Sequence, residues 1–378
     1  MNLIIVGDFC PNARLASVDL RRREVISPDI SAVIHGADYS LVNLESPVAI
    51  PTAEPIPKQG PNLKCISETM NYLKSIGFSA LTLANNHIRD FGDDSLLNTI
   101  ECAKQNGLDY VGAGLPDDPM RETLYVRTSG ETIAIVNCCE NEFSVTDDLS
   151  IGTNPLDPIR QFRQIQAAKK MANYVVVIVH GGIEHFQYPS FRMKETYRFF
   201  IEAGADTVIN HHQHCYSGYE VYRGKPILYG LGNFCFDWEG KRKLPWNEGF
   251  MVRLSFGDEI TFKLYPYVQC DERPVVELMG DTAAAQFNEK ITQISETIKD
   301  DDSLKAIIAQ FYTNTEQDYR LALEPYSSRI GVALYRRNLL PSFVSKGRIL
   351  KLYDYVMCES HRERLKSFLR NQYSIIKR

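Results

Sequence analysis

Short apolar runs alternate with amphipathic stretches from Met1 to about residue 215 of this 378-residue chain. The runs include LIIV at residues 3–6, ALTLA at residues 80–84 and YVVVIV at residues 174–179. Short apolar runs separated by helical stretches are typical of βαβ units, in which helices cover a largely parallel sheet. We therefore predict an α/β fold for this part of the chain.

The amphipathic stretches between the apolar runs have helical spacing. In the stretch 65–76, Ile66, Met70 and Leu73 fall on one face, and Gly77 follows as a common helix-ending residue. Comparable stretches lie at residues 94–106, 162–172 and 191–203. We expect a helix in each.

Beyond His214 the pattern changes to strands joined by tight turns. YEVY at residues 219–222 and PILYGL at residues 226–231 flank a glycine-containing turn, and a second hairpin signal lies at residues 256–259. We predict that these strands are antiparallel and complete a second sheet.

The last part of the chain has helical spacing and many charges. Ile291, Ile294 and Ile298 fall on one face of the first such stretch. The predicted organisation is a main domain over residues 1–280 and a helical C-terminal extension over residues 281–378. The extension could cover the crevice, mediate oligomerisation or contact membrane-bound biosynthetic machinery, and its mixed charge does not distinguish these roles.

The composition is that of an ordinary globular protein, with 44% hydrophobic and 24% charged residues. The net charge is -5, and nucleic-acid binding needs a basic surface, so nucleic acid is excluded as a main partner. The nine cysteines show no CxxC spacing, which argues against a disulfide framework or a structural zinc site. Because no signal-peptide pattern and no apolar run of about 20 residues is visible, we expect a cytoplasmic protein.

Residue types that favour metals or phosphates follow the apolar runs, and most of the eight histidines are among them. In an open α/β sheet, the loops at the carboxyl ends of the strands converge on one crevice. We therefore expect the following residues to meet there: Asp8, Glu45, Asn86, His87, His180, His212 and His214.

This set supplies the oxygen and imidazole ligands that divalent ions need. The carboxylate of Glu45 could lie between two ions. The first ion would take Asp8, Glu45 and His214, and the second would take Glu45, Asn86, His180 and His212. His87, next to a ligand, could protonate the leaving oxygen of a substrate. The sequence predicts a centre for one or two divalent ions, with Mn, Fe or Zn as the main candidates.

Six short motifs follow one another in this part of the chain. They are GD, NLE, NNHxxDxG, VHGGxEH, HHxH and LGNF, at residues 7–8, 43–45, 85–92, 179–185, 211–214 and 231–234. Their order and spacing resemble those of the bacterial poly-γ-glutamate capsule-synthesis (CapA-type) proteins, a branch of the calcineurin-like metallophosphoesterase superfamily. Each motif alone is a weak signal, but the ordered set is specific.

The resemblance implies a four-layer αββα sandwich with metals between its two sheets, and metal-dependent hydrolysis of a phosphoester. On this basis we predict action on a phosphorylated precursor or linkage in the synthesis of a cell-surface polymer. Two alternatives stay open. One is metal-assisted hydrolysis or ligation of γ-glutamyl amides, and the other is non-catalytic binding of an anionic polymer.

Three positions depart from the related proteins. Cys10 stands where phosphoesterases usually have a histidine, Glu45 stands where the bridging residue is normally an aspartate, and Gly181 stands where the CapA-type branch commonly has a tryptophan. Cys10 is a further candidate ligand, because a thiolate binds softer ions such as zinc. The missing histidine favours the binding alternative.

Six more polar residues in or near these motifs are candidate contacts of a phosphorylated or anionic substrate. Each is equally consistent with a solvated or hydrogen-bonded neighbour of the site. They are Glu184, His185, His211, Glu220, Tyr229 and Asn233. The proline-rich segment 47–61 could in addition overhang the crevice.

Overall fold

The computed structural model describes residues 1–16, 24–127, 130–147, 149–242 and 245–376. The chain divides into two compact units, Met1–Asp301 and Asp302–Arg378. The first unit contains both large β-sheets and all the residues predicted to form the site.

Two large sheets form the centre of the first unit. The strands of the eight-stranded sheet are β1 (Asn2–Cys10), β2 (Tyr39–Leu44), β3 (Ala80–Thr82), β4 (Asp109–Val111), β13 (Asn233–Phe236), β14 (Glu248–Ser255), β15 (Thr261–Gln269) and β16 (Val276–Leu278). Their order is β16-β15-β14-β1-β2-β3-β4, and β13 pairs with the end of β1.

The six-stranded sheet has the order β11-β12-β10-β9-β7-β6. Its strands are β6 (Thr123–Arg127), β7 (Thr132–Cys139), β9 (Tyr174–His180), β10 (Thr207–His211), β11 (Tyr219–Tyr222) and β12 (Lys225–Leu228). A short pair, β5 (Ala113–Gly114) and β8 (Gly152–Thr153), forms a third sheet.

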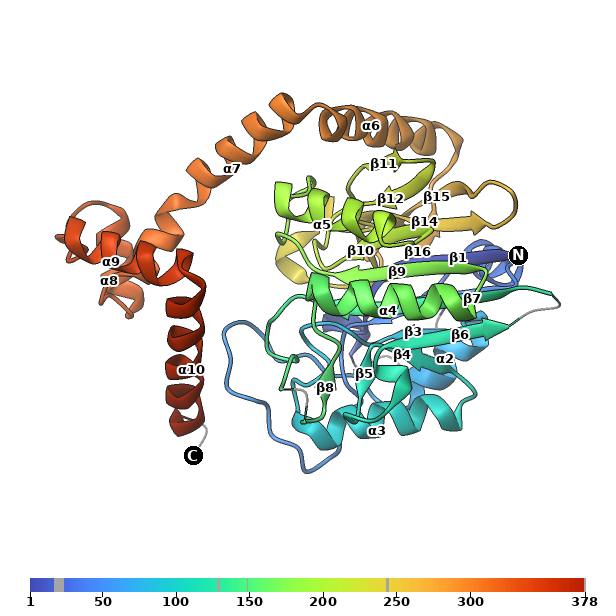
Figure 1. The fold of residues 1–378 in the computed structure, drawn as a ribbon, viewed down its shortest axis with the longest axis horizontal. Helices are drawn as coiled ribbons and strands as arrows, with labels where there is room; N and C mark the ends of the chain where they lie inside the picture. Colours follow the sequence, from blue (N-terminus) through green and yellow to red (C-terminus); the bar gives the residue numbers. More distant parts are fainter. Residues whose placement is uncertain (17–23, 128–129, 148, 243–244, 377–378) are drawn as a thin grey trace. The chain divides into compact units, whose positions relative to one another are not determined.

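Helices cover the outer face of each large sheet (Figure 1). The eight-stranded sheet carries α1 (Pro28–His35), α2 (Glu68–Ile76) and α3 (Gly92–Gln105), and the six-stranded sheet carries α4 (Pro158–Met171) and α5 (Phe191–Glu202). A sixth helix, α6 (Asp281–Lys299), packs against β11 and β15, one strand from each sheet. The first unit is therefore a four-layer αββα sandwich, and the predicted fold class is confirmed.

The apolar run in β1 is continuous because both faces of its sheet are buried. Leu3 and Ile5 belong to the core that lies between the two sheets, whereas Ile4 and Val6 belong to the core beneath α1, α2 and α3. All four side chains are fully buried. Because successive side chains of β1 point to opposite faces of the sheet, this strand contributes apolar side chains to both cores.

A β-bulge at Gly7 reverses this alternation just before Asp8. Val6 and Phe9 are three positions apart, yet both pack in the core beneath α1, α2 and α3. The register of β1 against β2 shifts in the same place. The extra residue turns the Asp8 side chain toward the space between the sheets, where its Oδ2 accepts a hydrogen bond from the backbone N–H of His212 at 3.2 Å.

We expect Gly7→Ala to destabilise the first unit by about 1–3 kcal/mol or more and to lower its metal content. A Cβ at Gly7 would lie 1.7 Å from the carbonyl oxygen of Gly232, and a backbone atom cannot swing aside. Relief of the clash would shift the strand that carries Asp8. Thermal unfolding and metal analysis measure both effects. The control is Gly240→Ala, because a Cβ there meets nothing within 4 Å. Unchanged unfolding of Gly7→Ala would contradict this expectation.

Two features of the organisation differ from the prediction. The strands beyond His214 do not all join the second sheet, because β14 pairs antiparallel with β1 and brings β15 and β16 into the eight-stranded sheet. The compact unit also continues past the boundary predicted at residue 280. The reason is that α6 buries Phe287, Ile291 and Ile298 in the core of the sandwich.

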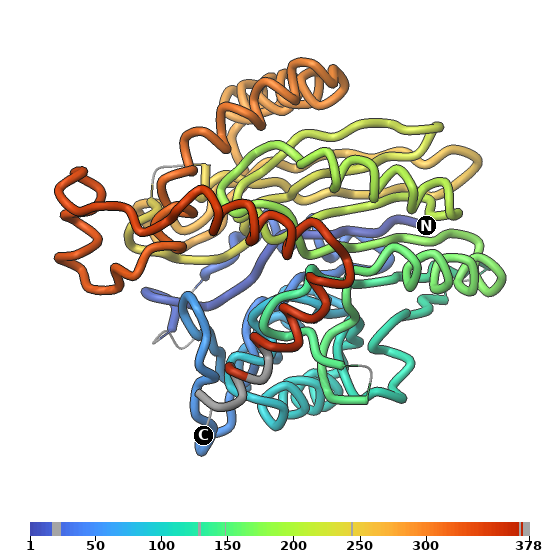
Figure 2. Tube along the Cα trace, turned by 60° about the vertical axis from the view of Figure 1, so that its left-hand side comes forward, coloured from blue at the N-terminus to red at the C-terminus, as the bar shows by residue number. Residues whose placement is uncertain are grey.

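The second unit consists of helices, which agrees with the predicted helical extension (Figure 2). They are α7 (Asp301–Ala322), α8 (Arg329–Arg336), α9 (Lys346–Met357) and α10 (Glu359–Ile376). Large apolar side chains such as Ile330, Tyr353 and Phe368 are exposed on these helices. Over the described part of the chain, none of the helices combines the length and the apolar character that a membrane span needs.

Candidate metal centre

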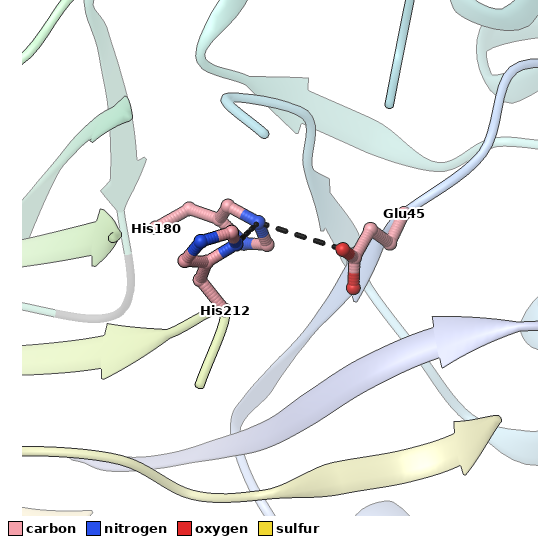
Figure 3. A group of neighbouring side chains, drawn as sticks. All are labelled: Glu45, His180 and His212. Atoms are coloured by element: carbon pink, nitrogen blue, oxygen red, sulfur yellow. Dashed lines mark hydrogen bonds and ion pairs between the residues drawn. The ribbon is translucent and has the colours of Figure 1, made fainter. Parts of the chain in front are cut away.

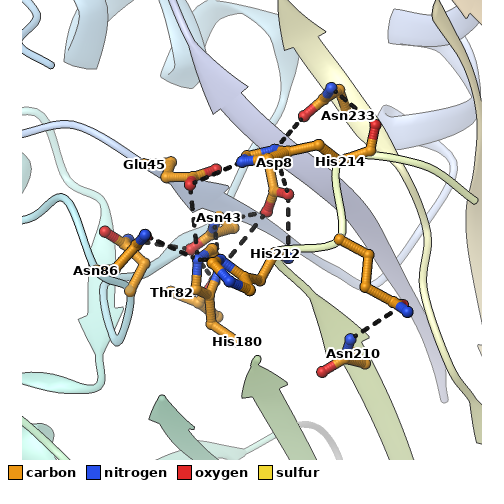
Figure 4. Close-up of polar contacts among 12 residues, drawn as sticks. Asp8, Asn43, Glu45, Thr82, Asn86, His180, Asn210, His212, His214 and Asn233 are labelled. Carbon is orange, nitrogen blue, oxygen red and sulfur yellow. Dashed lines mark hydrogen bonds and ion pairs between the residues drawn. The ribbon is translucent and has the colours of Figure 1, made fainter. Parts of the chain in front are cut away.

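Both large sheets deliver predicted ligands to one place, at the carboxyl ends of their strands (Figure 4). Those that follow or end strands of the eight-stranded sheet are Asp8, Glu45 and Asn86, and those of the six-stranded sheet are His180, His212 and His214. All six side chains are buried. The sandwich therefore encloses the group of residues between its two sheets.

One set of ligand atoms surrounds His180 Nε2 (Figure 3). This nitrogen lies 3.1 Å from Asn86 Oδ1 and 3.1 Å from His212 Nδ1. It also lies 3.6 Å from Glu45 Oε1. Atoms bound about 2.0–2.2 Å from one ion lie roughly 3–3.5 Å from one another. The spacing fits the four ligands predicted for the second ion.

A second set joins Asp8, Glu45 and His214. His214 Nδ1 lies 3.6 Å from Asp8 Oδ2, and His214 Nε2 lies 3.6 Å from Glu45 Oε1. Because Glu45 Oε1 is equally close to His180 Nε2, one carboxylate oxygen borders both sets. Asn233 Oδ1 lies 2.9 Å from His214 Nδ1 and can accept a hydrogen bond from its N–H, which leaves Nε2 to face Glu45. Asn233 therefore orients a proposed ligand.

The environment of the Glu45 carboxylate indicates whether the site suits a cation. Its side chain is fully buried, and neither oxygen has a hydrogen-bond partner. A buried ionised group is costly unless it is paired or coordinates a metal. With imidazole nitrogens of His180 and His214 both 3.6 Å away, the donor set fits one or two divalent ions.

Burial also sets the protonation states of the group. It raises the pKa of Asp8 to about 6, and burial followed by the nearby charge of Asp8 raises the pKa of Glu45. Burial lowers the pKa of His180 and of His214 well below the usual value, so both rings are neutral at pH 7. Neutral imidazole is the form that binds metals, and a cation favours the ionised carboxylates.

The backbone around the histidines is strained. His185, His212 and His214 have φ values of 62°, 88° and 55°, in the left-handed region that residues with a side chain rarely adopt. Such conformations persist where the surrounding structure imposes them, and they cluster at functional sites. The strain lets the loop after β10 aim His212 and His214 into the same space.

Asn43 orients ligands from both sheets, a role that the sequence did not indicate. Its Nδ2 donates to Asp8 Oδ1 at 2.7 Å and lies 3.3 Å from His180 Nδ1. Asn85 Nδ2 donates to Asn43 Oδ1 at 3.2 Å and holds that amide in place. The NLE motif contains Asn43, but a motif alone does not separate a ligand from a residue that orients one.

Cys10 lies in an apolar wall of the site. It packs with Leu63, Phe236 and Trp246, and burial raises the pKa of its thiol. Among the described residues, three groups of His, Cys, Asp and Glu could hold an ion, and Cys10 belongs to none of them. The structure therefore does not support its predicted role as a ligand. All nine cysteines are free.

His87 lies next to Asn86 and is almost fully buried. Its Nδ1 lies 2.7 Å from Asp90 Oδ2 and can donate a hydrogen bond to that carboxylate. Nε2 is then the ring nitrogen that can face a substrate. The pair has the i,i+3 spacing of the NNHxxD motif, so the motif contained the signal for Asp90. Lys58 contacts both members of this pair, and no sequence signal indicated it.

Glu184 and His185 lie at the exposed rim of the centre. Their side chains are about half exposed, at 50% and 41%. Glu184 forms the third group that could hold an ion, with His212 and His214. The ring of His185 lies 5.6 Å from that of Trp246, between ring centroids. These positions agree with contacts to a substrate that enters from the rim.

Three predicted substrate contacts are placed elsewhere. Glu220 accepts hydrogen bonds from Tyr229 Oη at 2.6 Å and from Arg198, so both predicted residues are held in a buried network with α5. His211 ends β10 with its ring buried, and burial lowers its pKa to about 4. His211 lies in the HHxH motif and the other two residues lie outside the motifs, but all three side chains are buried, and the prediction is corrected for all three.

The two large sheets and the ligand-rich site between them define the class of this protein, a four-layer αββα protein with a candidate metal centre between its sheets. Residues 2–238 match the family described as bacterial capsule synthesis protein PGA_cap. The chain belongs to this family, and the resemblance inferred from its motifs is confirmed.

Relatives in the family are similar over the same region. The chain is 35% identical over 238 residues to the PGA biosynthesis protein CapA of Bacillus subtilis (strain 168), which covers 61% of this chain and 62% of that protein. It is 30% identical over 246 residues to the capsule biosynthesis protein CapA of Bacillus anthracis, with coverage of 63% and 60%. The chain thus spans less than two thirds of the length of these curated relatives.

Among solved structures, the chain resembles a putative 5'-nucleotidase from Staphylococcus aureus in complex with alpha-ketoglutarate. The two are 15% identical, with a TM-score of 0.45, and the match covers 77% of this chain and 58% of that chain.

Proposed function

We propose that the protein is a metal-dependent phosphoesterase. The observation that carries this proposal is the buried carboxylate of Glu45, which has no hydrogen-bond partner and lies 3.6 Å from imidazole nitrogens of two ligand sets. One shared carboxylate between two sets of ligands is the arrangement that a two-metal hydrolase needs.

Each side chain has a defined task in this proposal. Asp8, Glu45 and His214 would hold one ion, and Glu45, Asn86, His180 and His212 would hold the other. When bound, the ions supply Lewis-acid polarisation of phosphoryl oxygens. Asn43 and Asn233 keep the ligands in their rotamers through the hydrogen bonds described above. His87 in its imidazolium form, with Nδ1–H on Asp90, delivers its Nε2 proton to the leaving oxygen.

The substrate that we propose is a phosphorylated precursor or linkage in the synthesis of an anionic cell-surface polymer. Support comes from the family and from the names of the Bacillus relatives, which refer to capsule and PGA biosynthesis. The half-exposed side chains of Glu184 and His185 are the groups that we propose contact a large substrate. Manganese, iron and zinc are the ions that this mixed set of ligands favours.

Metal analysis combined with a hydrolysis assay tests the proposal. We expect protein purified without chelator to contain up to two ions per chain and, with added manganese, to hydrolyse an aryl phosphate monoester or diester. Asn86→Ala and His180→Ala should both lower turnover. A γ-glutamyl peptide serves as the second substrate. Cleavage of this peptide without cleavage of either phosphoester would replace the proposal by the amide alternative, and polymer binding without bound metal would replace it by the binding alternative.

A further inference from the structure

One segment of the first unit is tied to the site by several contacts with Asp90. This segment, residues 50–63, is called the strap below, and most of its residues are exposed. Asp90 holds it at several points. Its carbonyl oxygen accepts from Ile56 N–H at 2.8 Å and from Asn62 Nδ2 at 3.1 Å, and its Oδ2 accepts from Leu63 N–H at 2.6 Å.

Lys58 is the strap residue that reaches farthest into the protein. Although it lies in an exposed segment, none of its side chain is accessible to solvent. Its ammonium group forms a short ion pair with Asp90 Oδ1 and lies 3.0 Å from His87 Nδ1. It also lies 5.0 Å from the centroid of the Phe143 ring. A lysine is rarely buried unless it is paired, so this placement is specified by its partners.

The geometry separates two roles that Lys58 could have. Because the side chain has no accessible surface and its ammonium group faces Asp90, it does not present its charge to a substrate. Its contacts instead complete the set around the Asp90 carboxylate, whose two oxygens then have fixed donors: Lys58 on Oδ1, and Leu63 N–H and His87 on Oδ2. A carboxylate fixed on both oxygens fixes the ring that it binds.

We propose that Lys58 is a positioning residue for the acid–base group of the site. Its ion pair with Asp90, called the lock below, fixes the position of the Asp90 carboxylate. Asp90 in turn orients the His87 ring. Because Lys58 belongs to the strap, the same ion pair connects the strap to that ring. This inference rests on the proposed function for the role of His87. One contact then positions both the strap and His87, the group that protonates the leaving oxygen. We therefore expect the strap and the His87 ring to become ordered together.

Lys58→Met tests the proposal, because methionine keeps much of the volume and removes the charge and the donors. The matched control is Lys64→Met. Lys64 is the residue that directly follows the strap, and its ammonium group lies 5.1 Å from the centroid of the Phe91 ring, a contact comparable to that of Lys58 with Phe143. The control therefore removes the same charge and a similar ring contact but leaves the lock on Asp90 intact.

The first measurement does not depend on activity. Hydrogen exchange followed by mass spectrometry reports on peptides from residues 50–63 and 84–92 of the full chain. We expect exchange in both regions to be faster in Lys58→Met than in the wild type or in Lys64→Met. Equal exchange in all three proteins would overturn the lock, whether or not the protein proves to be a phosphoesterase.

The second measurement compares two substrates with manganese present, 4-nitrophenyl phosphate and phenyl phosphate. Phenolate is the more basic leaving group and needs more help from an acid. We expect Lys58→Met to lower kcat on phenyl phosphate by about 10- to 100-fold, with a much smaller loss on 4-nitrophenyl phosphate and little change in KM. Equal losses on both substrates would indicate general damage and overturn the positioning role. If the wild type hydrolyses neither substrate, the proposed function fails, and the exchange experiment still decides whether the lock exists.

Discussion

Glu45→Gln is expected to lower phosphoester turnover by about 100- to 1000-fold, because metal-ion charge stabilisation is worth several kcal/mol and about 1.36 kcal/mol corresponds to a tenfold change in rate. Glu45 Oε1 lies 3.6 Å from both His180 Nε2 and His214 Nε2, so loss of its charge weakens both proposed ion positions at once. A change at a ligand of only one set, such as Asn86, should leave the other set intact.

Rate and metal content need to be measured on the same preparation. We expect the metal content of Glu45→Gln to fall together with kcat, and we expect Glu259→Gln to match the wild type, because Glu259 is exposed in the turn between β14 and β15. If Glu45→Gln retains two ions per chain and the wild-type rate, Glu45 is not the shared ligand, and the assignment of the two sets has to be revised.

The sequence predicted the ligands well because strand ends are an unusually direct signal. Asp8, His180 and His212 each follow a run of apolar residues, and parallel strands bring such residues to one edge of a sheet. The four helices predicted between the strands are present as α2, α3, α4 and α5, with ends that differ by a few residues. The local sequence pattern was therefore enough to predict the alternation of strands and helices and the edge of the sheets at which the site lies.

Contacts made by side chains across the fold were not visible in the sequence. The direction of Asp8 depends on a bulge at Gly7, which no alternation of apolar residues reveals. Glu220 and Tyr229 were predicted as possible substrate contacts, equally consistent with hydrogen-bonded neighbours of the site. In the structure Glu220 accepts hydrogen bonds from Arg198 of α5 and from Tyr229, so both residues belong to a buried network.

Lys58 is a residue whose position next to the site was not predicted from the sequence. It lies 32 positions before Asp90 in a proline-rich segment, and nothing in the local pattern separates it from an ordinary exposed lysine. Only the packing of the strap shows that its side chain is buried. The sequence suggested that this segment could overhang the crevice, whereas the contact of Lys58 with Asp90 follows only from the structure.

Removal of metal is expected to reverse the order of stability between the wild type and Glu45→Gln. Without an ion, the wild type keeps a buried carboxylate with no hydrogen-bond partner. An unsatisfied buried polar group costs about 1–3 kcal/mol, and more if it is charged, whereas a neutral glutamine of nearly the same size avoids the cost of burying a charge. We therefore expect metal-free Glu45→Gln to unfold at a higher temperature than metal-free wild type.

With saturating manganese the wild type should become the more stable protein, because an ion that binds only the folded state stabilises it by about 2.7 kcal/mol at a concentration 100 times its Kd. Thermal unfolding of both proteins, with chelator and with manganese, measures the four values that are needed. A metal-free wild type that is more stable than metal-free Glu45→Gln would mean that the carboxylate is satisfied without a cation. We expect Glu45→Gln to be the more stable protein with chelator and the wild type to be the more stable protein with manganese. This reversal would show that Glu45 lowers the stability of the metal-free protein because it serves the metal centre.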